Sequence, residues 1–151
     1  VAYTLQGEYE KAITEYQQIT QADTAYFEAY NNLGYTYLEQ GKLDFAEEEL
    51  LKALKQNPPQ PVVSCIRKNL GRVHFAREDF DAAAGDLELA IAEKNTSCYV
   101  EALYYLALAY HTLDLIDQAC DTLFDYAFVA EHDEETRADQ VGQLFDLWAC
   151  S

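Results

Sequence analysis

The residues of this sequence best suited to metal binding or nucleophilic chemistry are four cysteines and three histidines. The cysteines are Cys65, Cys98, Cys120 and Cys150. They lie 33, 22 and 30 residues apart, so no CxxC pair and no Cys/His cluster has the spacing of a zinc site. We predict that each cysteine is a small, buried or half-buried thiol, although this spacing leaves disulfide pairing open.

The three histidines do not form a catalytic group with other residues of the sequence. His74 falls on a periodic apolar position, which predicts a packed side chain, and His132 lies between two acidic residues, which predicts a solvated one. Only His111 remains a candidate for a binding surface. The sequence lacks a glycine-rich phosphate loop and the HExxH, GxSxG and EF-hand motifs. We therefore predict no catalytic residue, no metal, no cofactor and no enzymatic activity.

The chain is strongly acidic: 10 lysines and arginines stand against 27 aspartates and glutamates, for a net charge of −17. This balance argues against nucleic acid as a partner, because nucleic-acid binding depends on basic residues that displace phosphate counterions. It argues equally against an anionic membrane surface. Such a charge is more often a solubility feature, and the alternative is a preference for basic partners.

Two further properties of the sequence bear on its location. No apolar run approaches the roughly 18–20 residues of a membrane span, so we predict no membrane insertion. The chain begins with Val and lacks the basic stretch and apolar block of a secretion signal. We expect a soluble piece of a longer or processed polypeptide, located in the reducing cytoplasm.

The elements that would position these side chains are visible as an internal repeat. Four segments, at 7–16, 41–50, 77–87 and 113–123, align so that an alanine recurs at intervals of 34, 37 and 36 residues. These alanines are Ala12, Ala46, Ala83 and Ala119. Upstream of the last three, a Leu-Gly or Leu-Ala pair recurs in the same way, at Leu33-Gly34, Leu70-Gly71 and Leu106-Ala107.

Each aligned block has apolar residues at helical spacing. Gly41 lies where a left-handed helix cap suits glycine, so we expect one helix to end there and the next to begin. Gly34 and Gly71 lie within helices, where each costs about 1 kcal/mol relative to alanine. A fold tolerates that cost where two helices approach closely, and the recurring alanines provide a matching small surface. The pattern predicts an antiparallel helix pair that is repeated along the chain.

This pattern resembles the tetratricopeptide repeat family over nearly the whole chain. The resemblance rests on the Leu-Gly pairs, on the later small residues Ala53 and Ala90, and on a closing proline at Pro58. The sequence departs from the family at Arg67, which replaces a large apolar residue, and at Tyr126, which replaces a small one. The resemblance implies an all-α fold, an α-solenoid of antiparallel helix pairs that forms a right-handed superhelix.

We interpret residues 1–151 as a single domain of this kind. It comprises a partial repeat, three full repeats and a final helix, at 1–26, then 27–60, 64–97 and 100–133, then 134–149. The Asn-Pro-Pro-Gln-Pro segment at 57–61 predicts a non-helical linker. The final helix has an apolar stripe that includes Ala138, Val141, Phe145 and Trp148. It is either a cap on the stack or the first helix of a truncated fifth repeat, and Val141-Gly142 fits the second pattern.

In this family the first helices of successive repeats line a concave channel that binds extended peptides or a helix of a partner. The alignment places nine candidate binding residues on that channel: Asn31, Tyr35, Lys68, Asn69, Arg72, Tyr104, Tyr105, Leu108 and His111. Some members of the family hold the C-terminal carboxylate of a chaperone with a Lys/Asn/Asn/Lys/Arg set. Only Asn69 matches that set, so we do not expect that particular role.

Two interpretations are open for the basic residues of the channel. Lys68 and Arg72 lie four residues apart and hence on one face of a helix. They either balance carboxylates across the channel, such as Glu28 or Glu101, or bind a carboxylate of a partner through charge-assisted hydrogen bonds. The resemblance and the missing catalytic motifs together predict a non-catalytic scaffold that binds another protein in the channel. The alternatives are a subunit that associates through its solenoid ends, with possible self-association, and, more remotely, an unrecognised enzyme.

Overall fold

The computed structural model describes residues 2–23, 26–94, 96–130 and 138–150, and within these ranges all regular structure is helical. The helices are α1 (Ala2–Ala22), α2 (Phe27–Glu39), α3 (Leu43–Lys55), α4 (Gln60–Ala76), α5 (Phe80–Ala90), α6 (Tyr99–Thr112), α7 (Ile116–Ala130) and α8 (Ala138–Trp148). Among these described helices, none is both long enough and apolar enough to cross a membrane.

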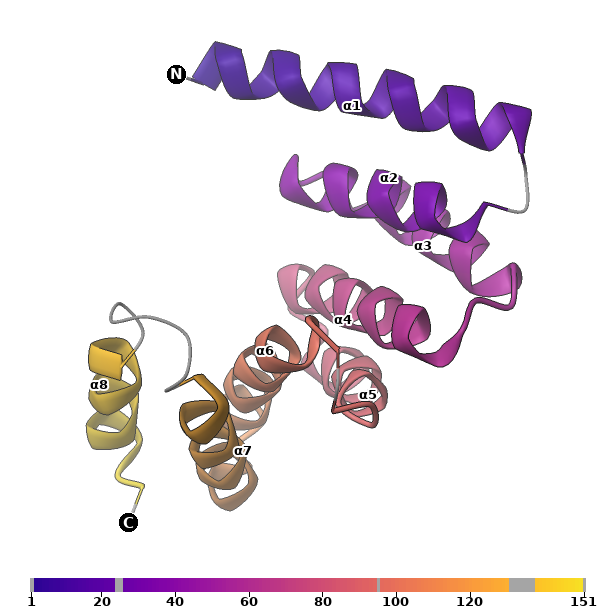
Figure 1. Ribbon diagram of the computed structural model, residues 1–151. Coiled ribbons are helices and arrows are strands. Elements are labelled where there is room, and N and C mark those ends of the chain that lie inside the picture. The colour runs from indigo at the N-terminus through magenta and orange to yellow at the C-terminus, as the bar shows by residue number, and fades with distance from the viewer. Residues whose placement is uncertain (1, 24–25, 95, 131–137, 151) are drawn as a thin grey trace.

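The helices form three antiparallel hairpins, α2/α3, α4/α5 and α6/α7, that follow one another along an arc (Figure 1). We call α2, α4 and α6 the inner row, because α4 contacts both α2 and α6. The helices α3, α5 and α7 form the outer row. At the two ends of the arc, α1 packs on α2 and α8 packs on α7. This arrangement confirms the predicted all-α solenoid.

Close approach within a hairpin depends on the mid-helix glycines, as the sequence predicts. A Cβ atom added to Gly34 would lie 2.6 Å from Cγ of Leu50, and one added to Gly71 would lie 2.5 Å from Cγ of Leu87. Both leucines are fully buried. Any larger side chain at these two glycines would therefore displace the second helix of the hairpin.

The recurring alanines lie at the centre of the packing. Ala46, Ala83 and Ala119 are each 0 % exposed, and they belong to three successive core clusters along the solenoid. Gly41 has φ 74° in the turn between α2 and α3, which confirms the expected left-handed cap.

The linker between the first two hairpins is shorter than the sequence predicts. Pro59 is extended, with φ −64° and ψ 155°, but α4 begins at Gln60 and includes Pro61 in its first turn. The prediction of a non-helical segment through residue 61 is therefore wrong for its last two residues. Proline is compatible with the first turn of a helix, because the amide hydrogen that it lacks would have no partner within the helix there.

Two disulfides connect neighbouring parts of the solenoid. Cys65 in α4 is bonded to Cys98, which directly precedes α6, with 5.2 Å between the Cα atoms. Cys120 in α7 is bonded to Cys150, which follows α8, with 5.5 Å between the Cα atoms. The prediction of four thiols is therefore wrong. The separations of 33 and 30 residues are each close to one repeat, and each disulfide joins a helix to the end of a neighbouring one, α4 to the start of α6 and α7 to the end of α8.

The last helix buries its apolar stripe against α7. Val141 and Trp148 are 6 % and 7 % exposed, and the ring of Phe145 lies 4.5 Å from that of Phe124 in α7. The side chain of Ala138 and all of residues 131–137, including His132, lie outside the described residues. Within the described part, the apolar stripe predicted for this helix is confirmed.

Candidate binding surface on the inner row

The basic residues of the inner row are engaged in ion pairs with carboxylates of neighbouring helices. Lys68 Nζ lies 2.9 Å from Oε2 of Glu101, and its side chain is only 7 % exposed. Arg72 lies 2.9 Å from Glu39 on one side and 3.2 Å from Glu101 on the other. Of the two interpretations, the structure supports charge balance across the channel, with Glu101 as the shared partner. Glu28 instead accepts a hydrogen bond from the hydroxyl of Tyr26 at 3.1 Å.

Two tyrosine rings flank these cations. The guanidinium carbon of Arg72 lies 5.2 Å from the ring centre of Tyr105 and 5.9 Å from that of Tyr35, within the range of a cation–π contact. Lys68 Nζ lies 5.7 Å from the ring of Tyr35. Partial burial, with a further contribution from Glu39, raises the pKa of the Tyr35 hydroxyl, which is therefore neutral at physiological pH. Tyr35 is 43 % exposed and remains available to a partner.

An asparagine pair connects α2 to α4. Asn69 donates from Nδ2 to Oδ1 of Asn31 at 3.0 Å. Asn69 is 3 % exposed, and its Oδ1 has no hydrogen-bond partner among the described residues. This pair fixes Asn31 at the edge of a pocket, whereas Asn69 itself is buried beneath it.

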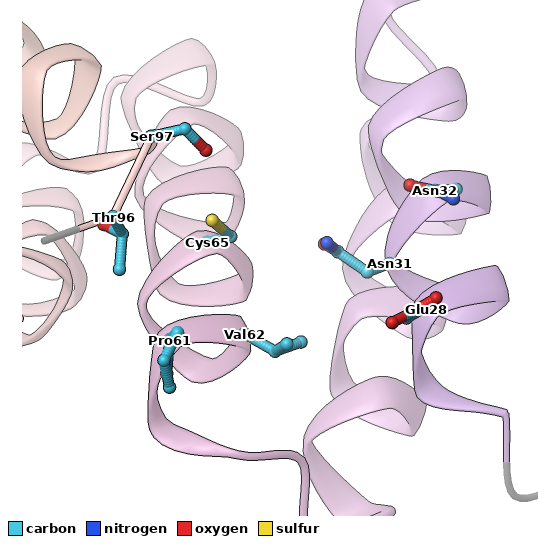
Figure 2. Close-up of a pocket in the computed structure, with 8 residues that line it drawn as sticks. All are labelled: Glu28, Asn31, Asn32, Pro61, Val62, Cys65, Thr96 and Ser97. Atoms are coloured by element: carbon cyan, nitrogen blue, oxygen red, sulfur yellow. The ribbon is translucent and has the colours of Figure 1, made fainter.

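The pocket beside Asn31 has a volume of about 410 Å³ and lies between α2, α4 and the segment that precedes α6 (Figure 2). Figure 2 shows Asn31 and Val62 pointing into the space between α2 and α4. The lining residues are Glu28, Asn31, Asn32, Pro61, Val62, Cys65, Thr96 and Ser97. Cys65 belongs to the first disulfide, which therefore holds α4 to the segment that contributes Thr96 and Ser97 to this pocket.

A second pocket of about 520 Å³ lies farther along the inner row, between α6, α7 and α8. Its lining residues are Ser97, Val100, Glu101, Tyr104, Tyr105, Tyr126 and Gln140. The three tyrosine rings follow one another, with 5.5 Å between Tyr104 and each of the other two. Ser97 is exposed and lines both pockets.

Tyr126 is a pocket residue that the sequence analysis did not identify. It occupies the position of Ala53 and Ala90, where the other two repeats have a small side chain. That departure from the repeat pattern is the signal that could have identified it, because a ring at a position otherwise reserved for alanine must extend toward a neighbouring helix.

Two of the predicted binding residues are covered by the last helix and its surroundings. The ring of His111 stacks on that of Trp148 in α8, with 4.4 Å between centres and 13° between planes. Leu108 is half-buried against the core cluster that includes Trp148. His74 is half-buried beside Asp86 and Glu47, at 3.4 and 4.0 Å. The structure thus places Asn31, Tyr35, Arg72, Tyr104 and Tyr105 along the inner row, with Lys68 and Asn69 buried beneath them, and separates His111 and Leu108 from them.

Comparison with known proteins finds similar sequences and similar structures. Protein bimA of Emericella nidulans is 40 % identical over 70 residues, which are 42 % of this chain and 9 % of that protein. The crystal structure of MamA aligns with a TM-score of 0.69 at 23 % identity, over 95 % of this chain and 88 % of that one. A putative kinesin light chain from Podosopora anserina with nearly identical TPR-like repeats aligns with a TM-score of 0.67 at 14 % identity, over 98 % and 85 %. Both structures share the fold.

Family models match three overlapping segments of the sequence. A TPR repeat model matches residues 2–41, and two tetratricopeptide repeat models match residues 25–92 and 68–130. The chain therefore belongs to the tetratricopeptide repeat family, whose helix pairs form a protein–protein interaction module.

Proposed function

We propose that the inner row binds a basic segment of a partner protein, by recognition and without catalysis. The single observation that supports this proposal is how the charged side chains of the inner row pair with one another. Lys68 and Arg72 already pair with Glu101 and Glu39, so neither cation is free to meet a carboxylate of a partner. Glu101 pairs with both cations, but its side chain is 40 % exposed, against 7 % and 17 % for Lys68 and Arg72, and a carboxylate can accept more than two hydrogen bonds. It lies in a pocket with three tyrosines.

A cationic side chain fits the chemistry of this pocket. An arginine or lysine of the partner would place its aliphatic stem along the half-buried Tyr104 and Tyr105 and its charged end toward Glu101. Aromatic rings and a carboxylate both favour a cation, by cation–π attraction and by charge-assisted hydrogen bonding. The volume of about 520 Å³ falls within the roughly 300–1,000 Å³ that is typical of ligand pockets. The net charge of −17 would attract such a segment from a distance.

Two labelled peptides test this proposal if they are identical except that one has arginines where the other has glutamates. Fluorescence anisotropy should show binding of the arginine peptide only, and the binding should weaken as salt is raised. Ser97→Trp, at an exposed residue that lines both pockets, should weaken binding about tenfold or more, the equivalent of one charge-assisted hydrogen bond.

Gln18→Trp is the matched control, because Gln18 is exposed on α1 and lines neither pocket. It should bind the arginine peptide as the original chain does. Equal weakening by the two tryptophan substitutions, or tighter binding of the glutamate peptide, contradicts the proposal. Glu101→Gln should also weaken binding, because it removes the negative charge and keeps the shape of the side chain.

The cytoplasmic location stays a prediction, and the two disulfides weigh against it. Disulfides persist in oxidising compartments and are rare in reduced cytosol. We propose instead that this domain functions in an oxidising environment. Alkylation of the denatured protein, isolated with a thiol-blocking reagent present, should detect no free thiol, and four free thiols would restore the cytoplasmic interpretation.

A further inference from the structure

One position of the repeat has a carboxylate in both α2 and α6. Glu28 in α2, Cys65 in α4 and Glu101 in α6 are equivalent, because each precedes the leucine of the aligned Leu-Gly or Leu-Ala pair by five residues. The helix α4 contacts both α2 and α6, so these three positions follow one another across the inner row. Glu28 and Cys65 line the pocket beside Asn31, which we call the first pocket, and Glu101 lines the second pocket.

The carboxylate of Glu28 has fewer partners within the chain than that of Glu101. Glu28 is exposed, and its Oε2 accepts a hydrogen bond from the hydroxyl of Tyr26 at 3.1 Å. Glu101 pairs with Lys68 and Arg72, whereas none of the ion pairs among the described residues includes Glu28. A carboxylate has about four acceptor sites on its two oxygens. Glu28 can therefore bind a cation without displacing a partner within the chain.

The other residues of the first pocket suit a long cationic side chain. Figure 2 shows Glu28 and Asn32 on one side of this pocket, and Pro61 and Val62 of α4 on the other. The apolar side can pack against the aliphatic stem of an arginine or a lysine. The carboxylate of Glu28 and the side-chain oxygen of Asn32 can accept hydrogen bonds from its charged end. Like the second pocket, the first thus combines a carboxylate with a surface for the stem.

The two pockets adjoin at a segment that a disulfide holds in place. Ser97 lines both pockets and belongs to the segment that precedes α6. The bond between Cys65 and Cys98 joins this segment to α4, the helix that lies between the two carboxylates. The arrangement of the pockets is therefore largely set before a partner binds, and such preorganisation lowers the cost of binding.

We propose that the first pocket binds a second cationic side chain of the same partner segment, so that one basic residue meets Glu28 and another meets Glu101. This inference rests on the proposed function, in which the second pocket binds the other cation. Packed helices lie about 8–10 Å apart, so Glu28 and Glu101, on either side of α4, are about 16–20 Å apart. An extended chain advances about 3.3 Å per residue and its alternate side chains face the same way, so the two basic residues are about six positions apart.

The spacing of the two basic residues distinguishes this site from general attraction between opposite charges. Two linked contacts bind more tightly than either alone, because the second forms within a complex that already exists. Two adjacent basic residues can fill only one of the pockets at a time. General attraction to the net charge of −17 depends on the charge of a peptide and not on this spacing.

Three nine-residue peptides test the proposal, with glycine and serine at all positions that are not arginine. The first has arginines at positions 2 and 8, the second has them at positions 4 and 5, and the third has a single arginine at position 5. Fluorescence anisotropy measures their binding to the whole chain at one salt concentration. The peptide with separated arginines should bind about tenfold or more tightly than the peptide with adjacent arginines, although the two have the same charge.

Glu28→Gln tests the first pocket directly, because it removes the charge and keeps the shape of the side chain. It should weaken binding of the peptide with separated arginines about tenfold or more, to the affinity of the peptide with a single arginine. Binding of the peptide with adjacent arginines should change little, since the pocket of Glu101 is intact. Glu8→Gln is the matched control, because Glu8 is exposed on α1 and lines neither pocket, and it should bind all three peptides as the original chain does.

The possible failures separate this site from the proposed function. Equal affinity for separated and adjacent arginines overturns the second cation site, and so does equal weakening by Glu28→Gln and Glu8→Gln. In either case the proposed function stands if the peptide with adjacent arginines binds and Glu101→Gln weakens it. Binding of none of the three peptides overturns the proposed function and the second cation site together. Circular dichroism melts of Glu28→Gln verify that the variant folds.

Discussion

The middle of the solenoid and its last helix both have a glycine at the same position of the repeat, but its surroundings differ. Gly71 in α4 is buried under Leu87, and an added Cβ would lie 2.5 Å from Cγ of that leucine. Gly142 in α8 has the same place in the repeat and open space around it. The repeat pattern therefore determines where a helix can be received, but whether the place is filled depends on what lies next to it. A residue that is a packing determinant in the middle becomes part of an accessible surface at the end.

Removal of one disulfide at a time should destabilise the middle and the end of the solenoid separately. They close loops of similar length, with separations of 33 and 30 residues, so each should contribute about 3–4 kcal/mol through the entropy of the unfolded chain. Trp148 is the one tryptophan of the sequence and is 7 % exposed. Replacement of both Cys120 and Cys150 by alanine should release α8 and shift tryptophan emission to longer wavelength.

Replacement of both Cys65 and Cys98 by alanine is the matched control. It should lower the free energy of unfolding by a similar amount but leave the emission of Trp148 in the native protein unchanged. If this control shifts the emission equally, α8 is not independent of the middle and the comparison fails.

Replacement of glycine by leucine should have different effects on the free energy of unfolding in the two regions. Gly71→Leu should lower the free energy of unfolding by about 2–3 kcal/mol, because the new side chain overlaps Leu87 in a filled core. Gly142→Leu should leave it unchanged or raise it by up to about 1 kcal/mol, because leucine is a better helix former than glycine. Urea unfolding followed by circular dichroism measures both. Equal losses from the two substitutions would show that Gly142 is not uncovered in solution.

Much of the middle could be predicted from the sequence, because hairpin packing is local and repeated. The spacing of Gly34 and Gly71 and the alanines opposite them follow from alignment of one repeat on the next. The charge balance of Lys68 with Glu101 was one of two interpretations that the alignment left open. The repeat also predicted a groove, and five of the nine predicted binding residues lie along the inner row with part of their surface exposed.

The features that the sequence did not predict depend on contacts between repeats or at the ends. The cysteine spacing matches no zinc motif, and Cys65 meets Cys98 across the contact between neighbouring repeats, with 5.2 Å between the Cα atoms. The alignment predicts that His111 faces the groove, but Trp148 stacks on it, and that contact depends on how α8 docks. Tyr126 extends into a pocket from a position that the repeat reserves for alanine.

Loss of an ion pair of the inner row should change the free energy of unfolding by a smaller amount, and these pairs are found in the middle of the solenoid. Glu101→Gln removes the charge that faces the buried Lys68, and it should lower the free energy of unfolding by about 2 kcal/mol. Asp44→Asn, at a side chain that is 97 % exposed and pairs with Arg77, should cost less than about 0.5 kcal/mol. Combining Lys68→Met with Glu101→Gln should cost less than the sum of the two single changes, since neither charge is then left alone. Simple additivity would contradict a coupled pair.

The smallest effect compares two junctions of the same kind. Tyr110 donates to Glu88 at 2.6 Å, whereas the last junction has Phe145 on Phe124 and no hydroxyl. Tyr110→Phe should therefore cost about 1 kcal/mol, the net value of one hydrogen bond, and make the middle junction resemble the last. Urea unfolding at neutral pH, compared between the two chains, measures this difference.

The hydroxyl of Tyr110 should also make the difference in stability between the original chain and Tyr110→Phe depend on pH. Burial, and then the hydrogen bond to Glu88, raises the pKa of Tyr110 above its ordinary value of about 10. A raised pKa in the folded state means that the contribution is complete below about pH 10 and is lost as pH rises through the folded value. The stability advantage over Tyr110→Phe should thus be constant near neutral pH and decline above about pH 10. An advantage that persists unchanged in alkali would mean that the hydroxyl of Tyr110 is not held by Glu88, and that the two junctions differ in shape alone.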